Sequence, residues 1–364
     1  MKNDWNKTLK KSAENNIFLT WEKMAPSVNS LGKESSLKIL CATEGNELVG
    51  IAPFRITHRN LKGHLGYGLI EPLTNGETDY TGIIMTEQED QCLNQFLVHL
   101  LSQKDWDFIF LPDLPQTSQT FALLKNTKYI PKFEVEAGVV CPYIAIPDSK
   151  EKLLAKLNAK FQKKLRKSLD KLEREQGKVE LKHYYEIGSL EQTMEIFIKL
   201  HQKRWTSKGE PGRFANQKSR NITIQTAKYF AEKGWLRLYF LTVENRPVAA
   251  ELNLEYEDKM YCHLKGFDPD FYKYRIGSLL TLKVLEECIE KRLSEYDFMQ
   301  GDEAYKFDWT NKFRRNMNVK WVNKKLSSNL INVGLKVLKR AKIDSILIKY
   351  IRILYSFTDL FKGL

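Results

Sequence analysis

Apolar, β-rich runs separated by short polar turns predict three consecutive strands in the second half of the chain. The strands span residues 235–243, 247–256 and 259–267, with short polar turns between them. Apolar residues then recur every three or four positions from Leu280 to Ile289, which predicts an amphipathic helix over 278–293. A further strand at 296–301 completes an order of elements that is typical of an α/β domain.

The first half of the chain repeats this order. ATEGNELVGIAPF (42–54) and LTVENRPVAAELN (241–253) both have the pattern of two strands around a polar turn, with identical residues at three aligned positions (Thr43/Thr242, Asn46/Asn245 and Val49/Val248). WDFIFL (106–111) likewise resembles YDFMQG (296–301), and each follows a predicted helix, which in the first half spans 88–103. Two matches in the same order favour a duplicated α/β domain.

A basic amphipathic helix is predicted between the two halves, over 148–177. Asp148 followed by Glu151 has the spacing of a capping box, and Gly177 is a typical helix stop. One face carries an apolar stripe: Leu154, Leu157, Phe161, Leu165, Leu169 and Leu172. The opposite face carries cations: Lys156, Lys160, Lys163, Lys164, Arg166, Lys167, Lys171 and Arg174.

Two further helices follow from capping and periodicity. Ser189 and Gln192 form a second capping-box pattern, ahead of the amphipathic run that ends at Trp205. The chain ends in a basic amphipathic stretch whose charges are too frequent for a membrane span. We therefore predict an N-terminal domain (1–147), a basic linker helix (148–177), a C-terminal domain (178–325) and a C-terminal helical segment (326–364).

The composition adds a strong positive charge to this picture. The 364 residues carry a formal net charge of +13, which favours anionic partners such as phosphorylated cofactors, nucleic acid or acidic membranes, while solubility alone explains it equally well. The five cysteines are scattered without a C-x-x-C pair, which indicates free thiols in a reducing compartment. The sequence has no metal-ligand spacing and no signal-peptide core, so we expect no metal and a cytoplasmic location.

The helix that begins at Gly277 and Ser278 is a candidate anion site. Free N–H groups at a helix N-terminus bind phosphate, a small residue lets the phosphate approach, and Lys273 and Arg275 stand just before the helix. An ordinary helix cap is the plainer interpretation, because helix starts with Gly and Ser are common.

Six segments carry a family resemblance: KLHQKRW (199–205), GRF (212–214), VAAEL (248–252), KGFDPDFYKYRIGSLL (265–280), YDFMQGDEAYKFDW (296–309) and TDYTGII (78–84). They resemble GNAT acyltransferases, most closely the branch called CelD-like after its cellulose-biosynthesis members. Such proteins are related to the Fem-type transferases of peptidoglycan synthesis, which carry two GNAT-like domains. The resemblance implies an α/β fold of two tandem GNAT-like (acyl-CoA N-acyltransferase) domains with mixed central sheets, followed by the C-terminal amphipathic helix.

The same resemblance implies roles for individual residues. Arg275, Gly277, Ser278 and Leu279 would form the pyrophosphate loop of an acyl-CoA donor, with Leu279 where the family has a second small residue. Asp302 or Glu303 would accept the proton of the attacking group, and Glu251 is the alternative base. Lys306 would stabilise the oxyanion or hold an anionic substrate group. Substrate contacts are expected from Arg204, Trp205, His263, Asp79, Tyr80 and Tyr305.

Structural interpretations of these residues stay open. Lys306 and Asp302 would then form only an ion pair on a loop, which contributes little stability. Tyr305 would be a core residue, like His201 in the stripe that ends at Trp205, and Asp79 would cap a turn.

These features predict an acyltransferase that moves an acyl group from acyl-CoA to an amine or hydroxyl of a sugar, cell-envelope glycan or peptide. Direct attack is expected, because no Ser-His-Asp or Cys-His arrangement is evident. We expect no DNA partner, and the C-terminal helix would contact a partner protein or, as a weaker alternative, the inner membrane face. One rival is an aminoacyl-tRNA-dependent transferase of the Fem type that binds tRNA through the basic helix. The other rival is a non-catalytic module that binds a glycan or a synthase.

Overall fold

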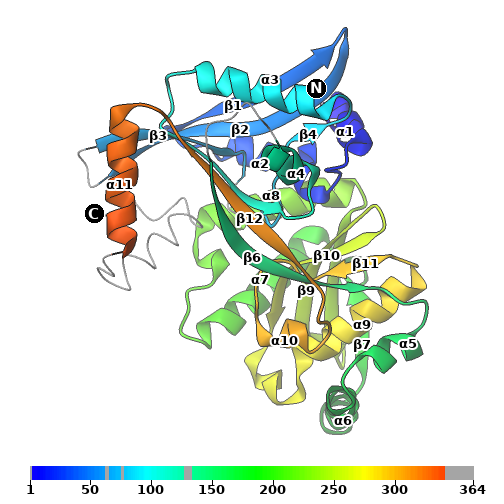
Figure 1. Cartoon of the computed structure of the whole chain (residues 1–364). Coiled ribbons are helices and arrows are strands. Elements are labelled where there is room, and N and C mark those ends of the chain that lie inside the picture. Colours follow the sequence, from blue (N-terminus) through cyan, green and yellow to red (C-terminus); the bar gives the residue numbers. More distant parts are fainter. Residues whose placement is uncertain (1, 62–64, 75–77, 127–132, 341–364) are drawn as a thin grey trace. The chain divides into compact units, whose positions relative to one another are not determined.

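The computed structural model describes residues 2–61, 65–74, 78–126 and 133–340 (Figure 1). Its contacts divide the chain into two compact units, of which unit 2 runs from Val140 to Arg314 and unit 1 comprises the residues before and after it. The four-part division expected from the sequence, with limits at 147, 177 and 325, stays a prediction.

Unit 1 holds a mixed sheet in the order β1-β2-β3-β5-β12, with the short β4 paired to β2. The strands are β1 (Ser35–Glu44), β2 (Glu47–Leu61), β3 (Leu65–Pro72), β4 (Ile84–Met85), β5 (Phe108–Pro115) and β12 (Phe313–Val322). The helices are α1 (Lys2–Lys11), η1 (Ile17–Leu19), α2 (Trp21–Asn29), α3 (Glu89–Ser102), α4 (Gln119–Asn126) and α11 (Leu326–Arg340). The predicted hairpin, helix and strand of the first half therefore form, and β3 and β5 pair in parallel, as expected for a strand–helix–strand crossover.

Unit 2 holds a second mixed sheet in the order β6-β11-β10-β9-β8-β7. Its strands are β6 (Glu134–Ala145), β7 (Val179–His183), β8 (Leu236–Val243), β9 (Arg246–Tyr256), β10 (Lys259–Phe267) and β11 (Glu295–Asp297). Its helices are α5 (Lys150–Lys156), α6 (Ala159–Gln176), η2 (Tyr184–Glu186), α7 (Leu190–Thr206), η3 (Arg213–Ala215), α8 (Gln217–Glu232), η4 (Pro269–Tyr274), α9 (Ile276–Glu290) and α10 (Ala304–Phe307). The three-stranded meander and the following helix match the prediction, which confirms the α/β fold class.

Two helices of unit 2 cover opposite faces of its sheet. The Lys265 side chain reaches Thr281 on α9, whereas the next residue, Gly266, lies directly against the backbone of His201 on α7. Successive residues of a strand point to opposite faces, so α9 and α7 sandwich β10. The capping box of α7 forms as predicted between Ser189 and Gln192.

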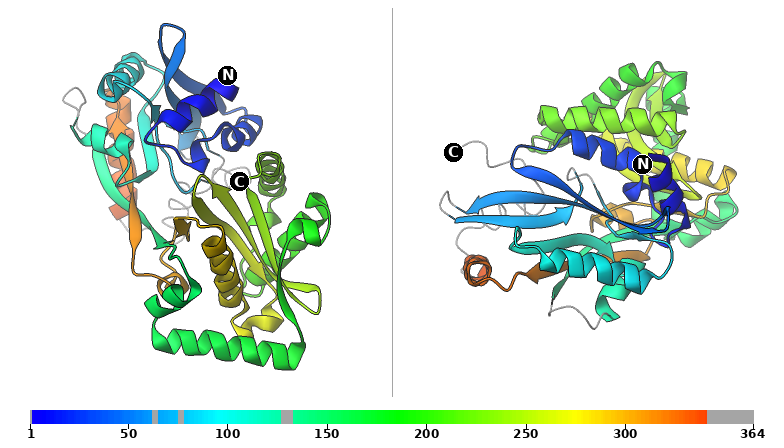
Figure 2. Two further views of the ribbon diagram at one scale, coloured as in Figure 1. Left: turned by 90° about the vertical axis from the view of Figure 1, so that its right-hand side faces the viewer. Right: turned by 90° about the horizontal axis from the view of Figure 1, so that it is seen from above.

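The predicted helix over 148–177 is wrong in one respect, because the structure divides it into α5 and α6. The chain leaves the helical conformation at Leu157 and Asn158, and the Asn158 side chain caps α6 by accepting from Lys160 N–H. The first helix is capped by Ser149, one residue after the expected Asp148. The apolar stripe nevertheless packs into the core of unit 2, and α6 contacts η4 and α9 at the edge of the unit (Figure 2).

The C-terminal helix is described only as far as Arg340. α11 therefore confirms the start of the expected amphipathic segment, and residues 341–364 lie outside the described part of the chain. Among the helices that the structure describes, none is both long and apolar enough to cross a membrane.

Candidate active site

The two central strands of unit 2 separate after three paired residues. β10 and β11 run parallel from Lys259 opposite Glu295 to Tyr261 opposite Asp297. β10 then continues along β9, whereas the chain after β11 follows β6, with hydrogen bonds from Phe298 N–H to Pro142 O and from Gly301 N–H to Val140 O. The register of β10 shifts at His263, between Cys262 and Leu264, and such bulges bend a strand. Beyond this point the facing backbone groups of the two strands no longer pair with each other.

A buried ion pair lies on β9 and β10 beside this divergence. Lys265 and Glu251 are direct cross-strand partners, and the Lys265 Nζ lies 2.8 Å from Glu251 Oε1. Lys265 also donates to Thr281 Oγ1 at 2.7 Å, and Thr281 donates to the same Glu251 oxygen at 2.8 Å. On the other carboxylate oxygen, Glu251 accepts from Tyr296 OH at 3.0 Å and from Asn253 Nδ2 at 3.1 Å. Both oxygens of this fully buried carboxylate therefore have two partners each.

These contacts set the charges of the cluster. Burial lowers the pKa of Lys265, but the adjacent carboxylate of Glu251 counteracts burial, and the pKa lies above its ordinary value. Burial raises the pKa of the Cys262 thiol to about 12 and that of the Tyr305 phenol to about 12, so both are neutral near pH 7. Near pH 7 Lys265 is therefore an ammonium that lies beside one carboxylate and two neutral groups.

The ammonium of Lys265 has capacity for one more acceptor. It uses one N–H for Glu251 and one for Thr281, and the rings of Phe298 and Tyr305 lie 5.6 and 5.5 Å from its nitrogen. Its side chain is 11% exposed. A cation fixed by a buried pair, with one donor left over, has the properties of a group that stabilises a developing oxyanion.

The start of α9 lies one turn from this pair. Thr281 Oγ1, which binds Glu251, is also 3.0 Å from the carbonyl oxygen of Gly277. In the described structure the N–H groups of Ile276 and Gly277 have no hydrogen-bond acceptor, and a Cβ on Gly277 would meet nothing closer than Phe267 at 3.8 Å. The first turn of α9 contains no acidic residue. This end of the helix therefore offers two open donors and a positive dipole to an anion.

The equivalent helix of unit 1 lacks this property. α3 is the α-helix that comes after β3 and the short β4, as α9 comes after β10 and η4, but the first turn of α3 carries Glu89 and Asp90. Two carboxylates at a helix N-terminus repel a phosphate. Of these two helix starts, only that of α9 is without acidic residues.

The residues expected in the pyrophosphate loop differ in whether they can still offer a group to an anion. Arg275 is exposed and adopts a left-handed conformation with φ 53° just before α9. Ser278 and Leu279 already donate their N–H groups to the carbonyl of Arg275, and the Leu279 side chain is buried in the core. Open donors are therefore provided by Ile276, which the sequence did not single out, and by Gly277.

Lys306 is enclosed by the loop that it was expected to serve. Its buried ammonium donates to the carbonyl oxygens of Met299 and Gly301 at 3.1 and 3.5 Å and to that of Gln300. It also pairs with Glu303 at 2.8 Å. The structure thus gives Lys306 a clamping role on residues 299–301, and its ion-pair partner is Glu303.

The carboxylates expected as bases occupy different environments. Asp302 is exposed, and within the described residues it has neither an ion pair nor a hydrogen-bond partner. Glu251 is saturated by its four donors. Of the two, Asp302 alone has free acceptor capacity for a proton from solvent or substrate.

Two of the expected substrate contacts come from α7. Arg204 donates to the carbonyl of Lys265 at 3.2 Å and lies over the rings of Phe267 and Trp205. His201, about one turn earlier on α7, is buried, and burial lowers the pKa of its imidazole to about 4. Arg204 therefore reaches the β10 strand of the cluster, while His201 is a neutral core residue.

Three further expected contacts are placed as follows. His263 occupies the bulge of β10 and is half-buried. Asp79 and Tyr80 lie in unit 1, where the Asp79 carbonyl accepts from Asn316 Nδ2 and the buried Tyr80 ring packs edge to face on Phe18. Their part in substrate binding stays a prediction.

Sequence reasoning did not identify Lys265, Thr281 or Tyr296. A lysine within the otherwise apolar strand MYCHLKGF is a weak local signal. Its partner, Glu251, is adjacent only through the register of β9 and β10.

Thiol reactivity gives a direct check on the environment of the cysteines. Cys41 is exposed, whereas Cys92, Cys141, Cys262 and Cys288 are buried, and burial raises the pKa of Cys92 to about 11. We expect one thiol to react rapidly with a disulfide reagent at pH 8 in the native protein, and the remainder only after denaturation. A Cys41→Ser variant should lose the rapid phase, and a rapid second thiol would contradict the packing around Cys262.

A comparison against protein families identifies a known domain in unit 2. Residues 159–307 match the family model described as an acetyltransferase (GNAT) domain. This chain is an acyltransferase by class. The GNAT match spans β10, α9, β11 and the whole Glu251–Lys265 cluster. Among described residues, no group of His, Cys, Asp and Glu is placed to hold a metal ion.

Solved structures extend the similarity to most of the chain. The structure titled FemX is 11% identical, covers 92% of this chain and 98% of its own, and superposes with a TM-score of 0.65. L-PGS from Bacillus licheniformis is 11% identical over 91% of this chain and 95% of its own, with a TM-score of 0.54. A conserved protein of unknown function from Bacteroides thetaiotaomicron is 9% identical over 88% of this chain and 97% of its own, with a TM-score of 0.56. By sequence, no curated protein matches the chain. At these identities the similarity concerns the fold.

Proposed function

We propose that this acyltransferase belongs to the CelD-like branch and transfers an acyl group from acyl-CoA to an amine or hydroxyl of a sugar, cell-envelope glycan or peptide. The observation that carries the proposal is the position of the α9 start one turn from the Glu251–Lys265 pair. An anion held at the N–H groups of Ile276 and Gly277 would place the rest of a donor along the divergence of β10 and β11.

Each residue of the cluster has a distinct part in this proposal. Acyl-CoA would supply the activated acyl group as a thioester. The third N–H of Lys265 would bind the carbonyl oxygen as negative charge develops on it. Glu251 and Thr281 would fix the ammonium and keep it charged, so they act through Lys265 and are positioning residues.

Proton transfers complete the reaction. As the acceptor nitrogen or oxygen forms its bond to the acyl carbon, Asp302 would take the proton it loses. The bond from carbon to sulfur breaks, and the neutral phenol of Tyr305, with its pKa near 12, would protonate the leaving thiolate. Burial of Cys262 as a neutral thiol supports direct attack without a covalent acyl-enzyme.

Titration calorimetry with acetyl-CoA and longer acyl-CoAs tests the donor. Ser278→Glu places a carboxylate in the first turn of α9, and we expect it to weaken acyl-CoA binding roughly tenfold or more, about 1.4 kcal/mol. Ser219→Glu is the matched control, because Ser219 lies in the first turn of α8, away from the cluster. Wild-type protein that binds no acyl-CoA would overturn this donor.

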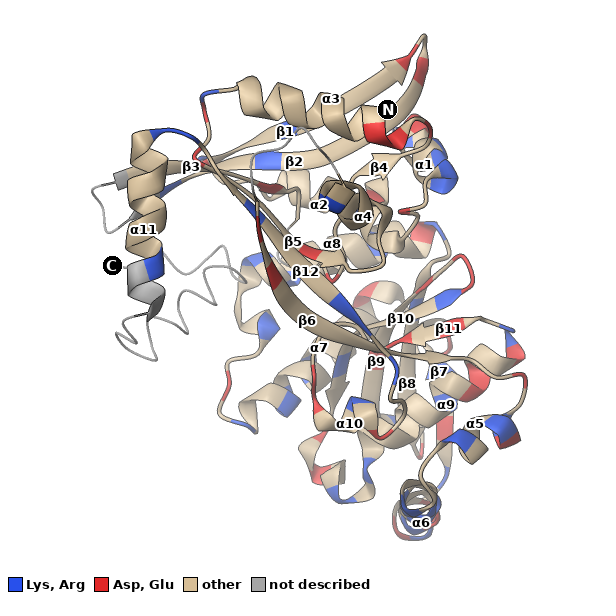
Figure 3. Cartoon of the chain, in the orientation of Figure 1, with Lys and Arg blue, Asp and Glu red and all other residues tan. Residues whose placement is uncertain are grey.

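An aminoacyl-tRNA donor is the second candidate, favoured by the basic face of α6. Figure 3 shows Lys and Arg over much of this helix. An aminoacyl-tRNA donor predicts salt-dependent RNA binding and no acyl-CoA binding, so the same calorimetric experiment separates the two donors.

A further inference from the structure

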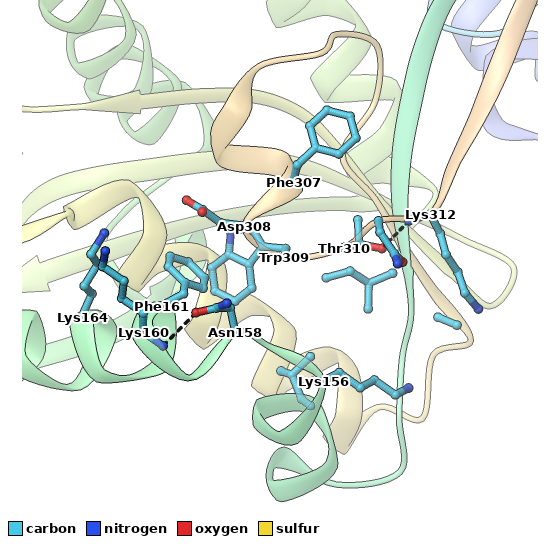
Figure 4. A pocket seen from close by; sticks show the side chains of 14 residues that line it. Lys156, Asn158, Lys160, Phe161, Lys164, Phe307, Asp308, Trp309, Thr310 and Lys312 are labelled. Atoms are coloured by element: carbon cyan, nitrogen blue, oxygen red, sulfur yellow. Dashed lines mark hydrogen bonds between the residues drawn. The ribbon is translucent and has the colours of Figure 1, made fainter.

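Unit 2 has a cavity outside the cluster described above. It has a volume of about 640 Å³ and is lined by the end of β6, by the junction of α5 and α6, and by residues 307–312 (Figure 4). No residue of β10 or α9 lines it. Its size is within the usual range for a small-molecule site.

The cavity is strongly basic. Lys156, Lys160 and Lys164 line one side and Lys312 another, and in the described part of the chain none of the four has an ion-pair partner. Asp308 is the single carboxylate among the lining residues. The N-terminus of α6, which Asn158 caps, also lies at the cavity. Its dipole adds to the positive potential of the lysines.

Aromatic side chains also line the cavity. Phe161 and Trp309 are buried and pack edge to face with their centroids 5.1 Å apart. Phe307, by contrast, is 40% exposed. The indole N–H of Trp309 has no acceptor among the described residues. An exposed ring beside four unpaired cations suits a ligand that combines a flat aromatic group with several negative charges.

We propose that this cavity binds a nucleotide, with its phosphates at Lys156, Lys160, Lys164 and Lys312 and its base on Phe307. Inorganic phosphate would use the lysines but leave Phe307 exposed. An RNA strand would spread over the whole basic face of α6, including Lys163 and Lys167, which lie outside the cavity. The concave shape and the exposed ring of Phe307 inside it favour the smaller ligand.

Calorimetry with ATP on the full chain tests the site. Lys160→Ala/Lys164→Ala should weaken ATP binding at least tenfold, since two charge-assisted contacts are lost. Lys163→Ala/Lys167→Ala is the matched control, because it removes the same charge from the same helix outside the cavity, and it should change the affinity less than twofold. The four substituted residues, Lys160, Lys163, Lys164 and Lys167, are all exposed. Both double variants should therefore fold, as circular dichroism can show.

Two single variants separate the phosphates from the base. Phe307→Ala should weaken ATP binding severalfold and leave the binding of inorganic triphosphate unchanged. Asp308→Asn should strengthen the binding of both, because it removes the one carboxylate of the lining. Three results would each overturn the nucleotide site. The first is an equal loss of ATP affinity in the two lysine double variants, and the second is triphosphate binding as tight as that of ATP. The third is the absence of ATP binding at 50 mM salt.

The source of the nucleotide is settled by competition. ATP that displaces acetyl-CoA would identify the ligand as the nucleotide end of the donor, whereas simultaneous binding would identify a separate nucleotide; both results support the site. Ser278→Glu should leave ATP binding intact, so failure of the proposed donor and failure of this inference give different results. An RNA hairpin that binds more tightly than ATP and is weakened equally by both lysine doubles would overturn the inference.

Discussion

Replacing Lys265 by Met is expected to lower kcat/KM for acyl transfer by roughly 100- to 1,000-fold, the usual cost of removing one oxyanion donor. Methionine keeps the length of the side chain but removes the ammonium that lies 2.8 Å from Glu251. The loss should fall on kcat, because the third N–H of Lys265 would act chiefly in the transition state. Thiol release with an acceptor found by screening, together with calorimetry of acetyl-CoA, separates kcat from donor binding.

Lys259→Met is the matched control for this variant. Lys259 lies on the same strand at its other end, opposite Glu295, and takes no part in the cluster. We expect its activity to stay within about twofold of wild type, a change below about 0.4 kcal/mol. Equal losses in Lys259→Met and Lys265→Met, or full activity of a folded Lys265→Met protein, would contradict the role of Lys265.

The part of Glu251 is tested through pH. Its negative charge raises the pKa of Lys265, so Glu251→Gln should let Lys265 lose its proton at a lower pH. Activity that depends on the ammonium should then decline at lower pH than in the wild type, with the alkaline limb of the pH–kcat/KM profile shifted down. A purely structural role would lower activity or stability without moving that limb.

Replacing Gly266 by Ala is expected to destabilise unit 2 by about 3 kcal/mol, at the upper end for overpacking. A Cβ at this position would lie 2.4 Å from His201 N, 2.7 Å from His201 Cα and 2.7 Å from Leu200 C. All three are backbone atoms of α7, which cannot rotate away as a flexible side chain does. Chemical denaturation followed by circular dichroism measures the loss.

Gly277→Ala is the control for this substitution. It changes the same residue type in the same unit, but its Cβ would lie 3.8 Å from Phe267, at ordinary van der Waals distance. We expect its stability to stay within about 1 kcal/mol of wild type, because alanine is the better helix former. Gly266→Ala as stable as wild type would show that α7 and β10 are farther apart than described.

The local elements could be predicted because their signals are local. The β-rich runs with their polar turns over 235–267 and the helical period after Leu280 are signals within short segments, and the structure reproduces them as β8, β9, β10 and α9. The break between α5 and α6 was missed for the same reason. The apolar stripe continues through Leu157 with helical spacing, and the second helix starts where Lys160 N–H donates a capping bond to the Asn158 side chain.

The same distinction between local signals and tertiary contacts applies to the candidate site. An anion site at the start of α9 stays a prediction, and it could be proposed from the sequence because Gly277, Ser278 and the flanking cations are neighbours along the chain. Lys306 was expected in contact with substrate, and its enclosure by three carbonyls depends on how residues 299–301 turn, which a spacing does not show.

The sequence by itself therefore determined the α/β class and the order of elements in both halves. Tertiary structure alone decided that Lys265, Glu251, Thr281 and Tyr296 form one buried cluster. These four residues belong to β10, β9, α9 and β11, so their contacts depend on strand register and on the packing of α9. Register and packing come from burial summed over the whole unit, and no short segment encodes them.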